Sequence, residues 1–174
     1  MAQFCGPKLV KKLHFKKTAN TTLIEGINKI ANAVGSTLGA SGRTVVIEDD
    51  FGNPHVTKDG VTVANSIMLH NPLENLAVAM MKQAAQQTAN VAGDGTTTSI
   101  VLAQAIIDCY KKQGGDAFSF RDIKSGITQY SKYIIDILEK MSIKVDDKRL
   151  EDVSIISANN DKELGKLIAS AFKK

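Results

Sequence analysis

Six consecutive residues, Gly93-Asp94-Gly95-Thr96-Thr97-Thr98, combine the groups that bind a phosphate together with a metal ion. The glycines permit positive φ and let the backbone approach a ligand closely. Free N–H groups and the dipole at the start of a following helix attract an anion, and threonine hydroxyls add donors. A carboxylate repels phosphate unless a cation lies between them, and Mg²⁺ commonly binds one or two carboxylates plus phosphate oxygens. The motif therefore predicts a phosphate site with Asp94 as metal ligand.

The same residues also allow an interpretation without a ligand. Asp94-Gly95 can be a simple turn in which Thr96 caps the next helix, a contribution of about 1 kcal/mol. Asp-Gly is also the commonest hairpin turn, but the flanking residues have helical periodicity and do not alternate. Both the ligand-binding and the purely structural interpretation remain open on this motif alone.

Two further glycine turns strengthen the ligand-binding interpretation. Lys58-Asp59-Gly60-Val61-Thr62 repeats Asp-Gly followed by residues able to start a helix. If this turn faces the same pocket, Asp59 can orient or activate a water while Asp94 holds the metal. The turn over residues 37–43 ends a long helical pattern and can contact the other side of a nucleotide. The chain contains no GxxxxGK[ST] phosphate loop.

Apolar residues at three- and four-residue steps predict the helices that position these turns. We expect helices over residues 18–37, 73–92, 97–110, 119–141, 150–158 and 163–172, and short strands over 44–47 and 55–57. The helix over 97–110 is apolar almost all round, which predicts a place in the middle of the core. The expected fold is mainly α, with a small β hairpin and an edge strand.

Composition excludes several classes of protein. The 174 residues are 43% hydrophobic, enough for one core or a core with a small second lobe. No apolar run approaches a membrane span, and the two distant cysteines suit neither a disulfide scaffold nor a zinc site. Five lysines in the first 17 residues account for the positive net charge of +4. Since this segment has no arginine, an edge strand over Lys11–Lys17 is favoured over a nucleic-acid-binding arm.

Together these motifs resemble the chaperonins, and within them the GroEL-type (group I) branch. The order and separations of the motifs also fit, and the resemblance runs from about Lys11 to the last residue. The matching stretches are Thr37 to Arg43, Thr57 to Val61, Ala92 to Thr98, Val101 to Ile107 and Ile156 to Asn159.

The resemblance implies an equatorial, ATP-binding domain over residues 1–140 and the start of an intermediate domain over residues 141–174. Asp94 would coordinate Mg²⁺, and Asp59 would assist hydrolysis. A K⁺ ion would lie near Thr37, Lys58 and Thr97. The N-terminal strand would pair with a neighbouring subunit. The residues implied to contact the nucleotide or its ions are Thr37, Leu38, Gly39, Ala40, Lys58, Gly93, Asp94, Gly95, Thr96, Thr97 and Thr98.

The chain departs from the family pattern in one turn, at one hinge position and in length. Ala40-Ser41 replaces the usual Pro-Lys after Gly39, and Lys144 stands near the position of a hinge proline. The family's apical domain, which binds unfolded polypeptides and the co-chaperonin lid, lies beyond the last residue. A second catalytic aspartate and the other half of the equatorial domain also lie beyond the last residue. On this reading, apolar helices such as residues 100–107 lose part of their packing, and the isolated chain is marginally stable.

Two hypotheses about function follow from the resemblance. The first is the N-terminal part of an ATP-hydrolysing chaperonin that folds proteins as a homo-oligomeric ring, without nucleic acid or membrane partners. The second is a truncated, non-catalytic chaperonin-like interaction module. The first implies ATP hydrolysis in the full-length protein and only very weak ATPase activity and no refolding by these 174 residues. The expected location is cytoplasmic, in a bacterial, viral or organellar soluble compartment.

Overall fold

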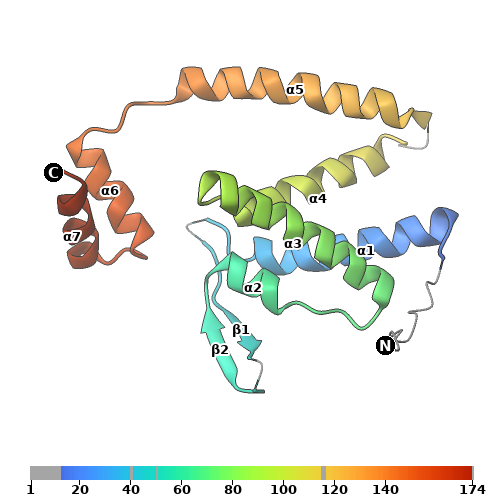
Figure 1. Ribbon diagram of the computed structural model, residues 1–174, viewed down its shortest axis with the longest axis horizontal. Coiled ribbons are helices and arrows are strands. Elements are labelled where there is room, and N and C mark those ends of the chain that lie inside the picture. The colour runs from blue at the N-terminus through green and yellow to red at the C-terminus, as the bar shows by residue number, and fades with distance from the viewer. Residues whose placement is uncertain (1–12, 40, 50, 115–116, 174) are drawn as a thin grey trace, which may run out of the picture. The chain divides into compact units, whose positions relative to one another are not determined.

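The computed structural model describes residues 13–39, 41–49, 51–114 and 117–173, and these residues are mainly helical (Figure 1). The expected fold class, mainly α with a small β hairpin, is confirmed. The expected helices and hairpin strands all form, with their ends shifted by a few residues. In chain order the elements are α1 (Lys16–Gly35), β1 (Val45–Glu48), β2 (Pro54–Thr57), α2 (Gly60–Ser66), α3 (Pro72–Ala92), α4 (Thr96–Lys112), α5 (Phe120–Met141), α6 (Asp147–Ser157) and α7 (Lys162–Phe172).

Packing divides the chain into two compact units, Met1–Gly115 and Asp116–Lys174. The first unit contains α1 to α4 and the hairpin, and the second contains α5 to α7. These two units are defined by which residues pack together. The domain boundary that the family resemblance implies lies elsewhere, between residues 140 and 141, and stays a prediction.

The core of the first unit lies where α1, α3 and α4 pack on one another, with α2 against them (Figure 1). Strands β1 and β2 pair antiparallel, with Val46 opposite Val56. Val45 and Ile47 pack against the core, whereas Val46 points to the exposed side. This alternation is the period-2 pattern of a half-covered strand. The buried core residues are Ile30, Ala31, Val34, Val63, Ala64, Val78, Met81, Ala85 and Ile100.

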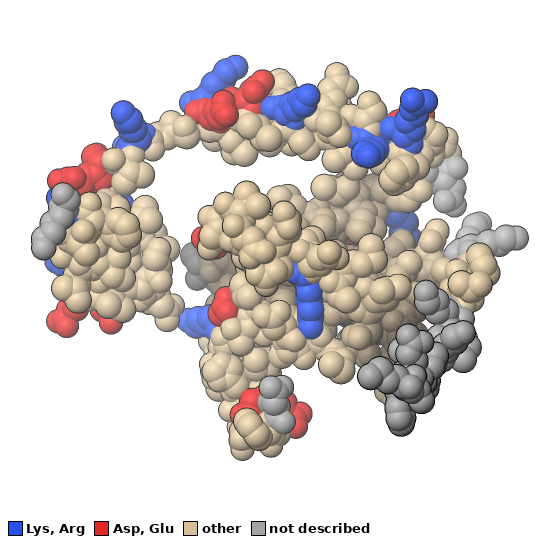
Figure 2. Space-filling view, viewed as in Figure 1, with Lys and Arg blue, Asp and Glu red and all other residues tan. Residues whose placement is uncertain are grey.

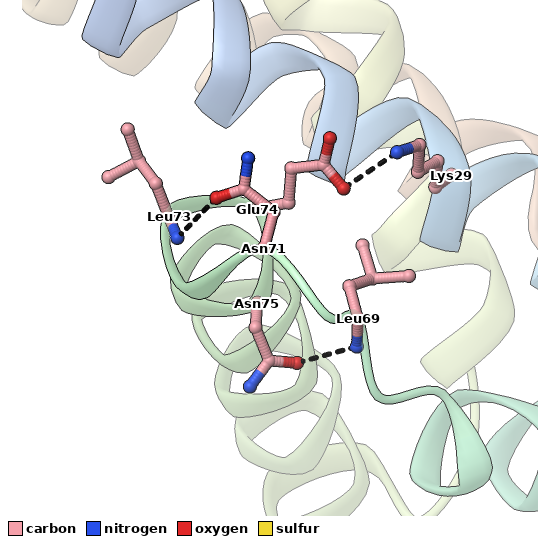
Figure 3. Close-up of polar contacts among 6 residues, drawn as sticks. All are labelled: Lys29, Leu69, Asn71, Leu73, Glu74 and Asn75. Carbon is pink, nitrogen blue, oxygen red and sulfur yellow. Dashed lines mark hydrogen bonds and ion pairs between the residues drawn. The ribbon is translucent and has the colours of Figure 1, made fainter.

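Helices α1 and α3 cross closely at Gly26, where a Cβ would lie 2.5 Å from the carbonyl oxygen of Glu74. At this crossing the ammonium of Lys29 bonds the carboxylate of Glu74 at 2.6 Å (Figure 3). The Glu74 side chain is only 11% exposed and the Lys29 side chain is 54% exposed. Asn71 caps the first turn of α3, and Asn75 accepts from the Leu69 N–H. These contacts fix the start of α3 against α1.

Replacing Lys29 with Met is expected to destabilise the first unit, because it leaves the buried Glu74 carboxylate without its cation. We expect a loss of about 2–3 kcal/mol in the free energy of unfolding. The matched control is Lys166→Met, which removes the cation of the exposed Lys166–Glu151 pair at 3.9 Å. That change should cost about 0–1 kcal/mol. Urea denaturation measures the free energy of unfolding of both variants. Equal losses in Lys29→Met and Lys166→Met would contradict the expected difference between the two ion pairs.

The expected edge strand is absent from the described part of residues 11–17. Residues 13–15 form no strand, helix α1 begins at Lys16, and residues 11 and 12 lie outside the described residues. An isolated strand leaves its backbone N–H and C=O groups without a ladder partner. The partner expected for this strand was a neighbouring subunit, and a single chain does not supply one.

The expectation that the helix over 97–110 lies in the middle of the core is wrong for this chain. Thr96 and Ile100 are the buried residues of α4, whereas Leu102 is 57% exposed and Ile106 is 47% exposed. Among the described residues, α1 and α3 cover one side of α4 and leave the other side uncovered.

The second unit has a helical hairpin, α6 and α7, and the long helix α5. A Cβ at Gly165 would lie 2.6 Å from Ile155 Cγ1, so a glycine lets α6 and α7 pack closely. No residue of α5 is buried. On the face in Figure 2, both basic and acidic side chains lie along α5, and residues drawn in tan cover much of α6 and α7.

Candidate functional site

The three glycine turns meet at Gly60, the first residue of α2. Gly60 is buried, and a Cβ there would overlap Thr97 Oγ1, lie 3.2 Å from Thr97 Cβ and lie 3.1 Å from Thr37 Oγ1. Thr37 follows the end of α1, and Thr97 lies in the first turn of α4. The structure therefore brings together one residue from each turn that the sequence singled out.

Both glycines of the turn between α3 and α4 have a positive φ angle. Gly93 ends α3 with φ 75°, and Gly95 precedes α4 with φ 83°, both in the left-handed region that favours glycine. Gly95 occupies the N-cap position, and no side chain among the described residues caps α4 there. The first N–H groups of α4 therefore remain available to an anion. The interpretation of Thr96 as an N-cap is wrong, since Thr96 is the first helical residue and is 7% exposed.

Asp94 is exposed at the tip of this turn, and its Oδ1 accepts the Gly95 N–H at 2.6 Å. That bond orients the carboxylate and leaves Oδ2 for a cation. The described residues contain no cluster of three or more His, Cys, Asp or Glu ligands. A cation at Asp94 would complete its shell with phosphate oxygens and waters, which is the coordination that Mg²⁺ prefers. The donor set therefore fits Mg²⁺ bound together with a phosphate.

Asp59 is the N-cap of α2 and is held by three hydrogen bonds. Its Oδ1 accepts the Val61 N–H at 3.2 Å, and its Oδ2 accepts the Thr62 N–H at 3.0 Å and the Thr62 hydroxyl at 2.6 Å. Partial burial, the largest single effect, raises the pKa of Asp59, but the bonds from Thr62 and Val61 outweigh it and hold the pKa below its usual value. Asp59 is therefore ionised at neutral pH, as a group that accepts a proton must be.

The lowered pKa of Asp59 also gives the direction of its effect on stability. Because the carboxylate is bonded in the folded chain, its stabilising contribution is complete above the pKa of the unfolded chain. That contribution is lost as the pH falls through the lowered pKa of the folded chain. At the pH of a nucleotide-binding assay the cap is intact.

The turn after α1 is tight and presents oxygen atoms near Gly60. Gly39 has φ 78°, and the Gly42 N–H bonds the Gly39 carbonyl at 2.9 Å. The Thr37 hydroxyl donates to the Val34 carbonyl at 2.7 Å, which leaves the lone pairs of its oxygen for another partner. Leu38 and Gly39 are exposed, as is Lys58, and Ala40 lies outside the described residues.

Comparison with known proteins identifies the family. A model of the TCP-1/cpn60 chaperonin family matches residues 30–174. The chain belongs to the TCP-1/cpn60 chaperonin family. Its predicted resemblance to chaperonins is thereby confirmed.

Curated chaperonin relatives match nearly the whole chain at 44% identity. One is the RuBisCO large subunit-binding protein subunit beta, chloroplastic, of Pisum sativum, over 95% of this chain and 28% of its own length. Another is chaperonin 60 subunit beta 3, chloroplastic, of Arabidopsis thaliana, over 97% of this chain and 29% of its own length. The chain therefore spans less than a third of the length of these chaperonins.

Solved chaperonin structures share the fold. The chaperonin gp146 from the bacteriophage EL 2, crystallised in the presence of ATP-BeFx, matches 89% of this chain and 28% of its own, with a TM-score of 0.76 and 31% identity. A group III chaperonin in the open state matches 88% of this chain and 31% of its own, with a TM-score of 0.73 and 26% identity.

Sequence reasoning missed two residues of the site. In the sequence Gly60 is only part of an Asp-Gly pair, and no local signal shows that residues 37 and 97 would lie against it. In the sequence Thr62 is only a residue able to start a helix, yet its hydroxyl donates a hydrogen bond to Asp59. A local signal for Thr62 was available. Asp59 is a capping residue, and three positions later Thr62 carries a side chain that can hydrogen bond back to it.

Proposed function

We propose that this chain is the N-terminal, nucleotide-binding part of an ATP-dependent chaperonin subunit that assists protein folding. The observation that carries the proposal is the meeting of Thr37, Gly60 and Thr97, which joins the three predicted turns in one place. Residues 1–140 would be the equatorial part, and residues 141–174 would begin the intermediate part. Membership in the chaperonin family supports the same function.

Each turn has a distinct role in this proposal. Asp94 would hold Mg²⁺, and the N–H groups and hydroxyls of Thr96 to Thr98 would bind phosphate oxygens beside Gly93 and Gly95. Thr37, Leu38 and Gly39, with Ala40, would contact the nucleotide. Oxygen atoms of Thr37, Lys58 and Thr97 would bind K⁺. When bound, Mg²⁺ would neutralise phosphate charge.

Asp59 would act on the water that attacks the terminal phosphate. It is ionised, oriented by three bonds and exposed, so it can accept a hydrogen bond and then a proton from water. Its position at the buried Gly60 places it in the turn that contacts both other turns. Hydrolysis in the full-length protein would also use groups beyond residue 174.

Replacing Asp59 with Asn is expected to slow ATP hydrolysis with little change in ATP affinity. Asn also caps helices well, so the substitution removes the charge and the proton acceptor without losing the cap. We expect the turnover number of the full-length gene product to fall by about 100-fold, the scale of general base catalysis. Radiometric phosphate release measures turnover, and calorimetry measures affinity.

The matched control is Asp161→Asn, which makes the same change at the N-cap of α7, where Asp161 accepts from Glu163 and Leu164. It should leave turnover unchanged. If the Asp59→Asn variant has the same turnover number as the Asp161→Asn control, Asp59 has no role in the hydrolysis step.

Ring assembly, unfolded polypeptides and a co-chaperonin lid are proposed partners of the full-length protein. The alternative, a non-catalytic module that docks on chaperonin subunits, is supported by the uncovered apolar side of α4, with Leu102 and Ile106 exposed. Native mass spectrometry of the 174-residue chain with and without Mg-ATP separates the two. Binding of Mg-ATP supports the nucleotide-binding part of a chaperonin. Complexes with chaperonin subunits, without nucleotide binding, support the non-catalytic docking module.

The compartment is proposed from the relatives and the sequence together. The plant relatives are named as chloroplastic, and a matching structure comes from a bacteriophage. No helix among the described residues is both long and apolar enough to span a membrane. We propose a bacterial, viral or organellar compartment.

A further inference from the structure

The carboxylate of Asp59 is not held symmetrically. Oδ2 accepts two hydrogen bonds from Thr62, one from its hydroxyl at 2.6 Å and one from its N–H at 3.0 Å. Oδ1 accepts one longer bond, from the Val61 N–H at 3.2 Å. The two oxygens of this residue are therefore chemically different in the folded chain.

Counting acceptor positions shows which oxygen remains free. An ionised carboxylate offers about four lone-pair positions, two on each oxygen. Both positions of Oδ2 are occupied by Thr62, whereas Oδ1 keeps one. A water that approaches Asp59 therefore finds its acceptor on Oδ1.

The Thr62 hydroxyl is the one side-chain donor among these three bonds. The two N–H bonds belong to the backbone of α2 and persist with any side chain at position 62. Thr62 is half-buried, while the adjacent Val63 and Ala64 supply the core contacts of α2. The hydroxyl can therefore be removed without emptying the core.

We propose that Thr62 is a positioning residue, whose hydroxyl occupies Oδ2 of Asp59 and thereby presents Oδ1 to the attacking water. The inference rests on the proposed role of Asp59 in hydrolysis. Without the hydroxyl, Oδ2 gains a free acceptor position, so the carboxylate rotates and water divides between two oxygens. Misorientation of a reacting group is costly in rate even when the group itself is present.

The test compares Thr62→Val, which has nearly the same shape without the hydroxyl, with Thr62→Ser, which keeps it. We expect Thr62→Val to lower kcat about tenfold with KM unchanged, and Thr62→Ser to restore kcat. Thr128→Val is the control, because the Thr128 hydroxyl bonds a backbone carbonyl on α5. It should change neither constant.

A second measurement on the 174-residue chain does not depend on turnover. NMR couplings across the hydrogen bonds from the Val61 and Thr62 amide nitrogens to the Asp59 carboxyl carbon report how the carboxylate is turned about Cβ–Cγ. We expect both couplings in the natural chain and in Thr62→Ser, and weakened couplings in Thr62→Val, where the carboxylate rotates. Couplings in Thr62→Val that equal those of the natural chain overturn the positioning role.

The outcomes separate this inference from the proposed function. If Asp59→Asn lowers kcat and Thr62→Val does not, Thr62 has no positioning role and the function of Asp59 stands. If Asp59→Asn leaves kcat unchanged, the hydrolytic role of Asp59 fails, and the role of Thr62 fails with it.

Discussion

Replacing Asp94 with Asn is expected to remove the dependence of ATP binding on Mg²⁺. Asn keeps an Oδ1 that can accept the Gly95 N–H, so the turn retains its geometry while the negative charge is lost. Without that charge the cation has no anionic protein ligand at this turn. We expect Mg-ATP to bind about 2 kcal/mol more weakly, which is roughly 30-fold.

Calorimetric titration of the 174-residue chain with ATP, with and without Mg²⁺, measures this effect. In the natural chain Mg²⁺ should tighten binding, and in Asp94→Asn the two titrations should coincide. Asp136→Asn, at an exposed carboxylate on α5, is the matched control and should behave as the natural chain. Persistent tightening by Mg²⁺ in the Asp94 variant would place the metal elsewhere.

Replacing Gly60 with Ala is expected to separate the three turns. The new Cβ would overlap Thr97 Oγ1 and press on Thr37 Oγ1, so α2 must move away from α1 and α4 or the threonines must rotate. Overpacking of this kind costs about 1–3 kcal/mol of stability. Because Thr37 and Thr97 are both proposed to contact the ligand, we also expect loss of measurable ATP binding.

Gly126→Ala is the matched control for this substitution. Gly126 lies within α5, and a Cβ there would have no heavy atom within 4 Å beyond the neighbouring backbone of its own helix. Alanine should therefore raise helix stability by about 0.5–1 kcal/mol without affecting ATP binding. If Gly60→Ala unfolds at the same urea concentration and binds ATP as before, the turns do not depend on this close contact.

The helices could be predicted because their signals are local. Apolar spacing predicted α3, and Gly93 predicted its end, since a left-handed residue stops a helix. Val45 and Ile47 indicated a strand by their β-branched side chains. Each of these signals lies within the segment that it describes.

The parts that could not be predicted depend on long-range contacts or on another chain. Leu102 and Ile106 have the same apolar character as Ile100, and only the packing of α1 and α3 decides that Ile100 alone of the three is buried. The closeness of Thr37 and Thr97 to Gly60 depends on the path of the chain between them. The expected edge strand depended on a partner that a single chain does not contain.

Helix α5 has 22 residues and none of them is buried, so its folding differs in kind from that of the first unit. Its stability comes from local terms, namely the Ser119 cap, Asp122 in the first turn and Lys140 in the last turn. Isolated helices in water are in a helix–coil equilibrium in which helicity depends on length and temperature. In this chain we therefore expect α5 to lose helicity gradually on warming, over a broad range of temperature, and α1, α3 and α4 to melt together as their shared core opens.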